Sequence, residues 1–271
     1  MVSFGSGVPL YDVLRDAIRA EQPVALATII ERTDGEPLHG HLVIRPGADP
    51  LGTLGHPDLD RVVARDAEGE LAAGLTSTRR YGPHGEARQD DVSVFIESFA
   101  APPRMVIFGA VDFTAALVRA AKLLGYRVTV CDARPVFATT QRFPLADEVV
   151  NDWPDRYLDS QGSTLGPADV VCVLTHDPKF DVPAITSAVK TRVGYIGAMG
   201  SRKTHSTRMD RLREAGLGDA ELGRVMAPIG IDIGARTPEE TAISIVAEII
   251  ALRTGRAVAS LRDGAGPIHR R

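Results

Sequence analysis

The second half of the chain alternates short apolar runs with segments of helical periodicity. Apolar runs of about four to eight residues are typical of buried parallel strands, whereas apolar residues three and four apart indicate helices. The pattern predicts strands at 105–109, 126–130, 143–150, 168–175, 193–197 and 225–228, and helices at 113–124, 181–190, 201–215 and 237–253. Because strands that alternate with helices form parallel sheets covered on both faces, this part is predicted to be a Rossmann-like, doubly wound α/β domain.

The first hundred residues show a different pattern, in which apolar and polar positions alternate. Val92, Val94 and Ile96 share one face of a predicted strand, which is the period of a half-buried strand. The sequence predicts strands at 24–31, 41–44 and 91–98, helices at 10–20 and 57–66, and loops at 51–57 and 77–90. This mixture predicts a small N-terminal α+β domain.

Two prolines, Pro102 and Pro103, separate these patterns just before a predicted strand, as is typical of a linker. We therefore expect an N-terminal domain at 1–100, a Rossmann-like domain at 104–255 and a C-terminal tail at 256–271. Thr237 and Glu240 have the spacing of a capping box, which predicts that the last helix starts there.

Charge and composition narrow the classes of protein. The net charge of −4 divides unevenly, with 9 basic and 16 acidic residues in 1–100 against 22 and 19 in 101–271. This asymmetry fits two domains and is too mild to indicate a nucleic-acid partner. No apolar run reaches the roughly 18 residues of a membrane helix. The N-terminus lacks the basic and apolar regions of a signal peptide, so we expect a cytoplasmic protein without a membrane span.

The chain has two cysteines, Cys131 and Cys172, each in or just after an apolar run. Such positions are typical of buried, reduced thiols. No spacing of cysteine and histidine indicates a metal site, and no nucleophile arrangement or Walker motif is visible. We therefore expect neither a resident metal ion nor a covalent catalyst.

Residues 105–132 have the order of a dinucleotide-binding unit, namely strand, turn, helix, strand and acid. Asp132 follows Gly109 by 23 residues, close to the spacing of a ribose-binding acid. The phosphate motif G-x-G-x-x-G should lie at 109–114, but Val111 and Thr114 replace its second and third glycines, and Asp112 would repel an anion. The usual pose of a pyrophosphate is therefore disfavoured.

Glycines and ionisable residues follow five of the six strands predicted for this domain. Ligands of open α/β sheets bind beyond the carboxyl ends of the strands, so these residues are predicted to line a ligand crevice. The candidate binding residues are Gly109, Asp132, Arg134, His176, Asp177, Gly197, Gly200, Ser201, Arg202, Gly230, Asp232 and Arg236.

Several candidates have two interpretations that the sequence leaves open. Asp132 would bind a ribose-like diol or cap a turn, and His176 with Asp177 would form an acid–base pair or start a turn. The segment 200–203 begins a predicted helix, where free amides and cations suit an anion. Arg236 would bind a phosphate or carboxylate, or hold its own loop. The residues alone favour an anionic, nucleotide-like or pterin-like ligand.

Four segments of the second domain resemble the XdhC/CoxI family in sequence and in order. They lie at 130–135, 174–181, 195–205 and 227–240, and the likeness extends over about 104–255. Members of this family are accessory factors for molybdoenzymes of the xanthine dehydrogenase and carbon monoxide dehydrogenase type. They have an N-terminal α/β domain and a C-terminal Rossmann domain, and they often form dimers.

The resemblance implies a function for this chain. Family members bind the molybdenum cofactor, a phosphorylated pterin, protect it and help its sulfurated form to reach the target enzyme. The resemblance thus implies a non-catalytic, cofactor-binding chaperone that forms a homodimer and has a molybdoenzyme and a sulfur donor as partners. Its candidate residues would hold the cofactor, with Ser201 and Arg202 at the phosphate.

The chain departs from the family at two places. Members usually carry glycines where Val111 and Thr114 stand, and they often have a cysteine followed by a glutamate in an N-terminal loop. The matching loop, 51–58, has no cysteine. Two alternatives therefore stay open: an NAD(P)-dependent oxidoreductase, and a ligand-free adaptor that binds a partner enzyme.

Overall fold

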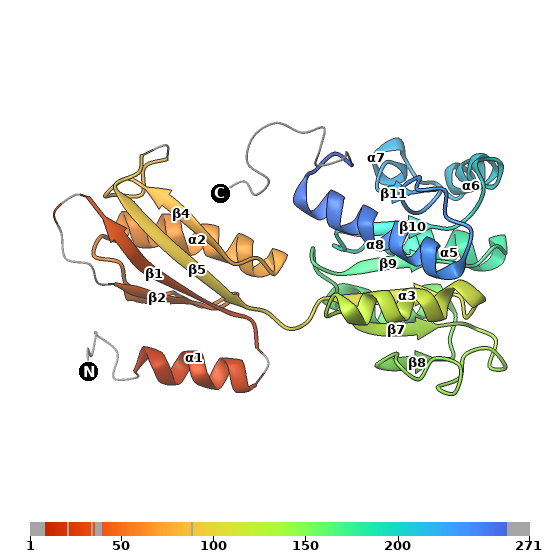
Figure 1. Ribbon diagram of the computed structural model, residues 1–271, viewed down its shortest axis with the longest axis horizontal. Helices are drawn as coiled ribbons and strands as arrows, with labels where there is room; N and C mark the ends of the chain where they lie inside the picture. The colour runs from red at the N-terminus through yellow and green to blue at the C-terminus, as the bar shows by residue number, and fades with distance from the viewer. Residues whose placement is uncertain (1–8, 21, 34, 36–39, 88, 259–271) are drawn as a thin grey trace. The chain divides into compact units, whose positions relative to one another are not determined.

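The computed structural model describes residues 9–20, 22–33, 35, 40–87 and 89–258. The described chain falls into two compact units, one before and one after the bond between Ala101 and Pro102 (Figure 1). Most of the predicted tail at 256–271 lies outside the described residues. No helix in the described ranges is long and apolar enough to cross a membrane.

The first unit is a five-stranded antiparallel sheet in the order β3-β2-β1-β5-β4. Alternate residues of β1 face opposite layers, because Val24 packs with α1 whereas Ala25 and Ala27 pack with α2. The elements are α1 Leu10–Arg19, β1 Val24–Arg32, β2 His41–Ile44, β3 Leu51–Thr53, α2 Pro57–Ala73, β4 Ser77–Tyr81 and β5 Val92–Phe99. This arrangement confirms the α+β class.

Two of the predicted loops are wrong, because 51–57 contains β3 and 77–90 contains β4. Both strands lie at the edges of the sheet, where a strand pairs on one side and its side chains meet water. β4 reads Ser-Thr-Arg-Arg-Tyr, and only its last residue, Tyr81, is buried. A polar edge strand of this kind lacks the alternation of apolar residues on which the prediction depends.

The second unit is a six-stranded parallel sheet in the order β11-β10-β9-β6-β7-β8. With β6 as the first strand, this is the order 6-5-4-1-2-3 of a Rossmann fold. The strands are β6 Arg104–Phe108, β7 Arg127–Cys131, β8 Glu148–Val150, β9 Val170–Val173, β10 Tyr195–Ala198 and β11 Val225–Met226. The predicted Rossmann-like class is thereby confirmed.

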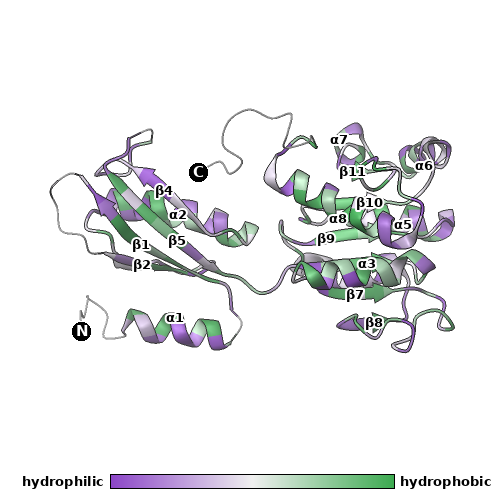
Figure 2. Cartoon of the chain, viewed as in Figure 1, coloured by the Kyte–Doolittle hydropathy of each residue, from purple (hydrophilic) through white to green (hydrophobic). Residues whose placement is uncertain are grey.

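Helices cover both faces of the parallel sheet, as Figure 1 shows. One face carries α3 Asp112–Leu123 and α8 Pro238–Thr254, and the other carries α4 Pro154–Gln161, α5 Pro178–Ala188, α6 Arg202–Glu214 and α7 Asp219–Leu222. Figure 2 shows the apolar residues concentrated in the strands, whereas α6 is mainly hydrophilic. The sequence did not predict α4 and α7, which are short and polar.

The start of α8 is fixed by the capping box that the sequence predicted. Thr237 Oγ1 accepts a hydrogen bond from Glu240 N, and Glu240 Oε2 accepts one from Thr237 N, each at 3.1 Å. We expect Thr237→Ala to lower the free energy of unfolding by about 1 kcal/mol, measured by urea denaturation. Thr254→Ala, at the exposed end of the same helix, is the control. Equal midpoints for the two variants would contradict this role of the cap.

Candidate functional site

Asp132 lies just beyond the carboxyl end of β7, and its carboxylate is fully engaged within the protein. Asp132 is 3% exposed, Oδ2 accepts from Ala110 N at 2.7 Å, and Arg134 donates to both carboxylate oxygens. Burial opposes ionisation, but the hydrogen bonds from Arg134 and Ala110 hold the pKa of Asp132 below its usual value. The geometry therefore favours a role for Asp132 in holding the turn over the binding of a ribose-like diol.

The turn after β6 is closed by its own side chains. Thr114 Oγ1 donates to the carbonyl of Gly109 and accepts from Val111 N at 3.2 Å. Gly109 has a φ of +109°, and a Cβ there would lie 2.8 Å from Thr175 Cγ2. The amides of Ala110 and Val111, which a G-x-G-x-x-G turn would direct to a phosphate, already have acceptors.

Aromatic rings surround Arg134 at the same edge of the sheet. Its guanidinium lies 4.5 Å from the ring centroid of Phe137 and 5.8 Å from that of Phe180. Trp153 lies against Phe180 with 5.1 Å between centroids. Phe137 and Trp153 remain exposed, so the edge offers two aromatic surfaces on which a planar ring can stack.

His176 and Asp177 follow β9, but no hydrogen bond joins them among the described residues. Asp177 is the N-cap of α5, where its Oδ1 accepts from Lys179 N at 3.1 Å. This backbone hydrogen bond lowers the pKa of Asp177. The geometry therefore favours the turn-starting interpretation of Asp177 over an acid–base pair and leaves His176 exposed at the loop.

The loop after β10 leads into α6 through Gly200 and Ser201. Ser201 Oγ accepts from Thr204 N at 3.1 Å and caps the helix. Gly200 has a φ of +151°, and a Cβ there would lie 3.2 Å from the side chain of Thr204. The side chain of Arg202 lies outside the part of the chain that the structure describes.

Two of the predicted glycines pack against protein atoms. A Cβ on Gly197 would clash with Ile229, and one on Gly230 would clash with Ser244 of α8. Gly230 N also donates to Glu248 Oε2 at 2.9 Å, which ties the loop after β11 to α8. These contacts explain both glycines by packing.

The remaining two predicted residues lie on the exposed loop before α8. Asp232 Oδ1 accepts from Gly234 N at 3.4 Å, and Arg236 N donates to Glu240 Oε2 at 2.6 Å. Both residues are exposed. Neither residue lines the cavity between α5 and α6.

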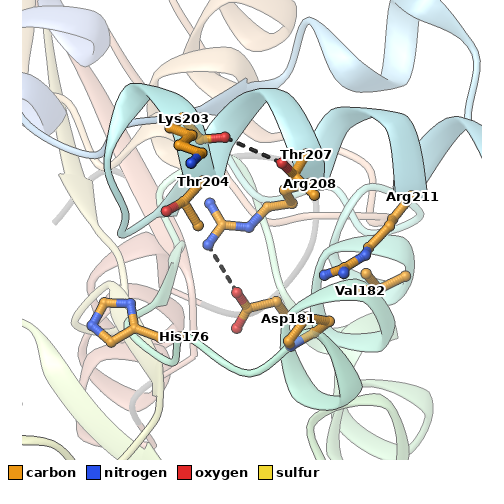
Figure 3. A pocket seen from close by; sticks show the side chains of 9 residues that line it. His176, Asp181, Val182, Lys203, Thr204, Thr207, Arg208 and Arg211 are labelled. Atoms are coloured by element: carbon orange, nitrogen blue, oxygen red, sulfur yellow. Dashed lines mark hydrogen bonds and ion pairs between the residues drawn. The ribbon is translucent and has the colours of Figure 1, made fainter.

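A cavity of about 250 Å³ opens between α5 and α6 (Figure 3). His176 is the one predicted binding residue among its described lining residues. Figure 3 shows α6 on one side of the cavity and His176, Asp181 and Val182 on the facing side. The lining residues are His176, Pro178, Asp181, Val182, Lys203, Thr204, Thr207, Arg208 and Arg211.

Arg208 forms the floor of this cavity together with Asp181. Both side chains are 4% exposed, and Arg208 Nη2 lies 2.8 Å from Asp181 Oδ2 and 2.7 Å from the carbonyl of Met199. Asp181 also accepts a hydrogen bond from Thr175. Burial raises the pKa of Asp181 above its usual value, although the hydrogen bonds from Thr175 and Arg208 partly offset this effect. Arg208 was not predicted from the sequence, although 204, 208 and 211 have the spacing of one helical face.

The two cysteines lie in the core of the second unit. Burial raises the pKa of Cys131 to about 12 and that of Cys172 further still. Elsewhere among the described residues, no group of three or more His, Cys, Asp or Glu side chains is arranged to hold a metal ion. Sulfur handling by either thiol would require the protein to open.

We expect both thiols of the native protein to resist a disulfide reagent at pH 8. With a pKa of about 12, only about one Cys131 in 10,000 would be a thiolate at that pH, and the thiolate is the reactive form. The coloured product of the reaction between the reagent and a thiol should appear only after guanidinium has unfolded the protein. Rapid release of one equivalent from the folded protein would contradict this burial.

The geometry defines a two-unit protein whose Rossmann sheet has a closed phosphate turn and an open, cationic cavity. The XdhC Rossmann domain matches residues 105–249, and the XdhC and CoxI family matches residues 17–82. The chain therefore belongs to the XdhC and CoxI family, as its motifs indicated.

Two relatives with functional names extend this comparison. A probable xanthine dehydrogenase subunit from Bacillus subtilis is 34% identical over 61% of this chain and 48% of its own length. The molybdenum cofactor insertion chaperone PaoD of Escherichia coli is 31% identical over 36% of this chain and 31% of its own length. The chain thus spans about half or less of these relatives.

A solved structure shares the fold. The crystal structure of a xanthine dehydrogenase from Bacillus halodurans superposes with a TM-score of 0.61 and 26% identity. The match covers 89% of this chain and 65% of that one. The similarity extends over both units of the present chain.

Proposed function

We propose that this chain is a maturation factor that binds the molybdenum cofactor and assists its delivery to a molybdoenzyme of the xanthine dehydrogenase or carbon monoxide dehydrogenase type. Membership of the XdhC and CoxI family supports the proposal. Two relatives, a cofactor insertion chaperone and a protein named as part of a probable xanthine dehydrogenase, point to the same process.

The observation that carries the proposal is the contrast between the closed turn after β6 and the open cavity beside α6. A pyrophosphate in the usual Rossmann pose needs free amides at the turn and no carboxylate nearby. Here Ala110 N and Val111 N are already hydrogen-bonded, and Asp112 begins the helix. These features disfavour an NAD(P)-dependent oxidoreductase. The cavity instead offers cationic side chains, which suit an anionic ligand of another shape.

The side chains at the carboxyl edge fit the chemistry of a phosphorylated pterin. The exposed rings of Phe137 and Trp153 offer stacking surfaces for the pterin. Ser201, Arg202 and the first amides of α6 would face its phosphate, with His176 at a polar atom. Asp132 and Asp177 would act indirectly by holding their loops in place. The other predicted residues, Gly109, Arg134, Gly197, Gly200, Gly230, Asp232 and Arg236, would shape the crevice.

The proposal includes a homodimer, a molybdoenzyme as partner, a sulfur donor as second partner, and a cytoplasmic location. It also includes domains at 1–100 and 104–255. The chain itself would perform no redox chemistry and would act as a chaperone for its cargo.

A ligand-free adaptor remains the second candidate, and one observation favours it. The loop that carries a cysteine in many relatives has His56 here, and the imidazole accepts from Asp58 N at 3.2 Å as the N-cap of α2. An adaptor would bind its partner enzyme equally well when Asp132 or Arg202 is replaced by alanine. A cofactor chaperone would lose cargo transfer in at least one of these variants.

Reconstitution of a cofactor-free xanthine dehydrogenase tests the proposal. The target enzyme is mixed with molybdenum cofactor in the presence of this protein or of an unrelated protein, and urate formation is followed. We expect several-fold more active enzyme with this protein than with the unrelated one. Equal activation in the two mixtures would reject the chaperone function.

A further inference from the structure

The cavity between α5 and α6 carries an excess of positive charge. Lys203 and Arg211 stand on its exposed rim, and Arg208 forms its floor. Asp181 is the one carboxylate among the described lining residues, so three permanent cations face a single anion. The cavity therefore has a net charge of about +2 before His176 is counted, and it attracts anions.

Two guanidinium nitrogens of Arg208, at the floor of the cavity, lack hydrogen-bond acceptors among the described residues. Nη2 is paired with Asp181 and Met199, but Nε and Nη1 are buried and have no hydrogen-bond partner among the described residues. A buried guanidinium nitrogen without an acceptor is costly, and charged donors of this kind prefer oxyanions. An oxyanion seated against Arg208 would supply the acceptors that these nitrogens lack.

The remaining lining residues suit the same kind of group. Thr204 and Thr207 bring hydroxyls from the same face of α6, and His176 faces them from the loop after β9 (Figure 3). Lys203 and Thr204, two of the lining residues, belong to the first turn of α6, and a helix N-terminus favours negative charge. Cations, hydroxyls and a helix start together form a cradle for tetrahedral oxyanions.

Size and charge together select one kind of phosphate. The volume of about 250 Å³ is below the roughly 300–1,000 Å³ of pockets that enclose whole ligands. It accommodates one phosphate group and its attachment, while the rest of the ligand lies outside. A phosphate monoester carries a charge of about −1.5 to −2 at pH 7, which balances the excess positive charge of the cavity, whereas a simple phosphodiester has a single ionisable oxygen and carries less.

We infer that the cavity between α5 and α6 is a binding site for the terminal phosphate monoester of the ligand, built on Arg208, Lys203 and Arg211. This inference deepens the proposed function and rests on it for the identity of the molecule that carries the phosphate. His176 at the mouth directs the remainder of the ligand toward the carboxyl edge of the sheet, where Phe137 and Trp153 are exposed.

Calorimetric titration with ethyl phosphate and diethyl phosphate, at constant ionic strength in chloride buffer, tests this site. We expect the monoester to bind at least 10-fold more tightly than the diester. Lys203→Ala and Arg211→Ala should each weaken monoester binding about 5-fold, and the double variant about 30-fold, because each removes one charged contact. Arg213→Ala is the matched control, since Arg213 lies on α6 outside the cavity and pairs with Asp210.

Arg208→Lys gives an independent readout, because it keeps a cation beside Asp181 and removes the planar fork. We expect a folded protein with monoester affinity at least 10-fold lower. The rim variants keep the test decisive should this buried variant fail to fold. Equal affinity for the two esters, or unchanged monoester binding in the Lys203→Ala/Arg211→Ala variant, would overturn the inference.

A parallel titration with molybdenum cofactor separates this inference from the proposed function. Cofactor binding that the double rim variant leaves unchanged would overturn the phosphate site and leave the chaperone function intact. Selective monoester binding without any cofactor binding would support the site and reject the chaperone function. Loss of both ligands in the same variant supports both.

Discussion

Replacing Arg208 with methionine is expected to lower the free energy of unfolding by about 3–5 kcal/mol, the typical cost of leaving a buried charge unpaired. Arg208 and Asp181 are 2.8 Å apart and almost fully buried. Methionine fills much of the space but donates no hydrogen bond, so Asp181 Oδ2 and the carbonyl of Met199 lose the donor Nη2, and Asp181 keeps only the hydrogen bond from Thr175. Urea denaturation followed by circular dichroism measures the loss. Arg211→Met, on the exposed rim, should change the free energy of unfolding by less than about 0.5 kcal/mol.

The pH dependence of this loss identifies its cause. Without Arg208, the folded-state pKa of Asp181 rises further above its unfolded value, because burial already raises it and Arg208 lowers it. A raised folded-state pKa means that stability is retained below the unfolded pKa and lost as pH rises through the folded one. The loss in the free energy of unfolding caused by Arg208→Met should therefore be larger at pH 7.5 than at pH 4.5. The double variant Arg208→Met/Asp181→Asn should recover more than half of it, and a double variant as unstable as the single one would contradict this cause.

Asp132→Ala is expected to lower the free energy of unfolding by about 2–4 kcal/mol, since a buried donor left without an acceptor alone costs about 1–3 kcal/mol. The substitution leaves Ala110 N unpaired at the turn after β6 and releases the guanidinium of Arg134. Asp112→Ala is the matched control, because that carboxylate is 92% exposed. A thermal or urea transition of Asp132→Ala that coincides with the control would contradict the structural role of Asp132.

The pH dependence of Asp132 runs in the opposite direction. Its pKa is lowered in the folded protein, so its contribution to stability is present above the unfolded carboxyl pKa of about 3.9. That contribution is lost as pH falls through the lower folded-state value. The difference in the free energy of unfolding between the wild type and Asp132→Ala should therefore shrink as the pH falls. A difference that is independent of pH would show that the ionised carboxylate is not the stabilising form.

The sequence predicted best those elements whose side chains are buried on both faces. β6, β7, β9 and β10 are almost continuous apolar runs, which is what a parallel sheet between two helical layers requires. Elements that meet water on one side were harder to predict. The polar edge strand β4 and the short helix α4 carry too few apolar residues for either period to be visible.

The sequence predicted the loops at the carboxyl ends of the strands, but it did not predict the contacts that their side chains make. The crevice interpretation relied on the ends of strands, and it correctly located the loops that carry Asp132, His176 and Ser201. It could not show that the carboxylate of Asp132 accepts hydrogen bonds from Ala110 and Arg134, because these contacts depend on how two loops meet. Nor could it show that Arg208 is buried, because its partner lies 27 residues earlier on another helix.

Direct binding of the molybdenum cofactor tests the proposed chaperone function most directly. Purified protein is dialysed to equilibrium against molybdenum cofactor released from a molybdoenzyme, and in parallel against NADH and NADPH, and bound ligand is quantified per chain. We expect saturable binding of the cofactor, close to one equivalent per chain, and retention of neither nucleotide. Saturable binding of NADH or NADPH without binding of the cofactor would contradict the proposed function.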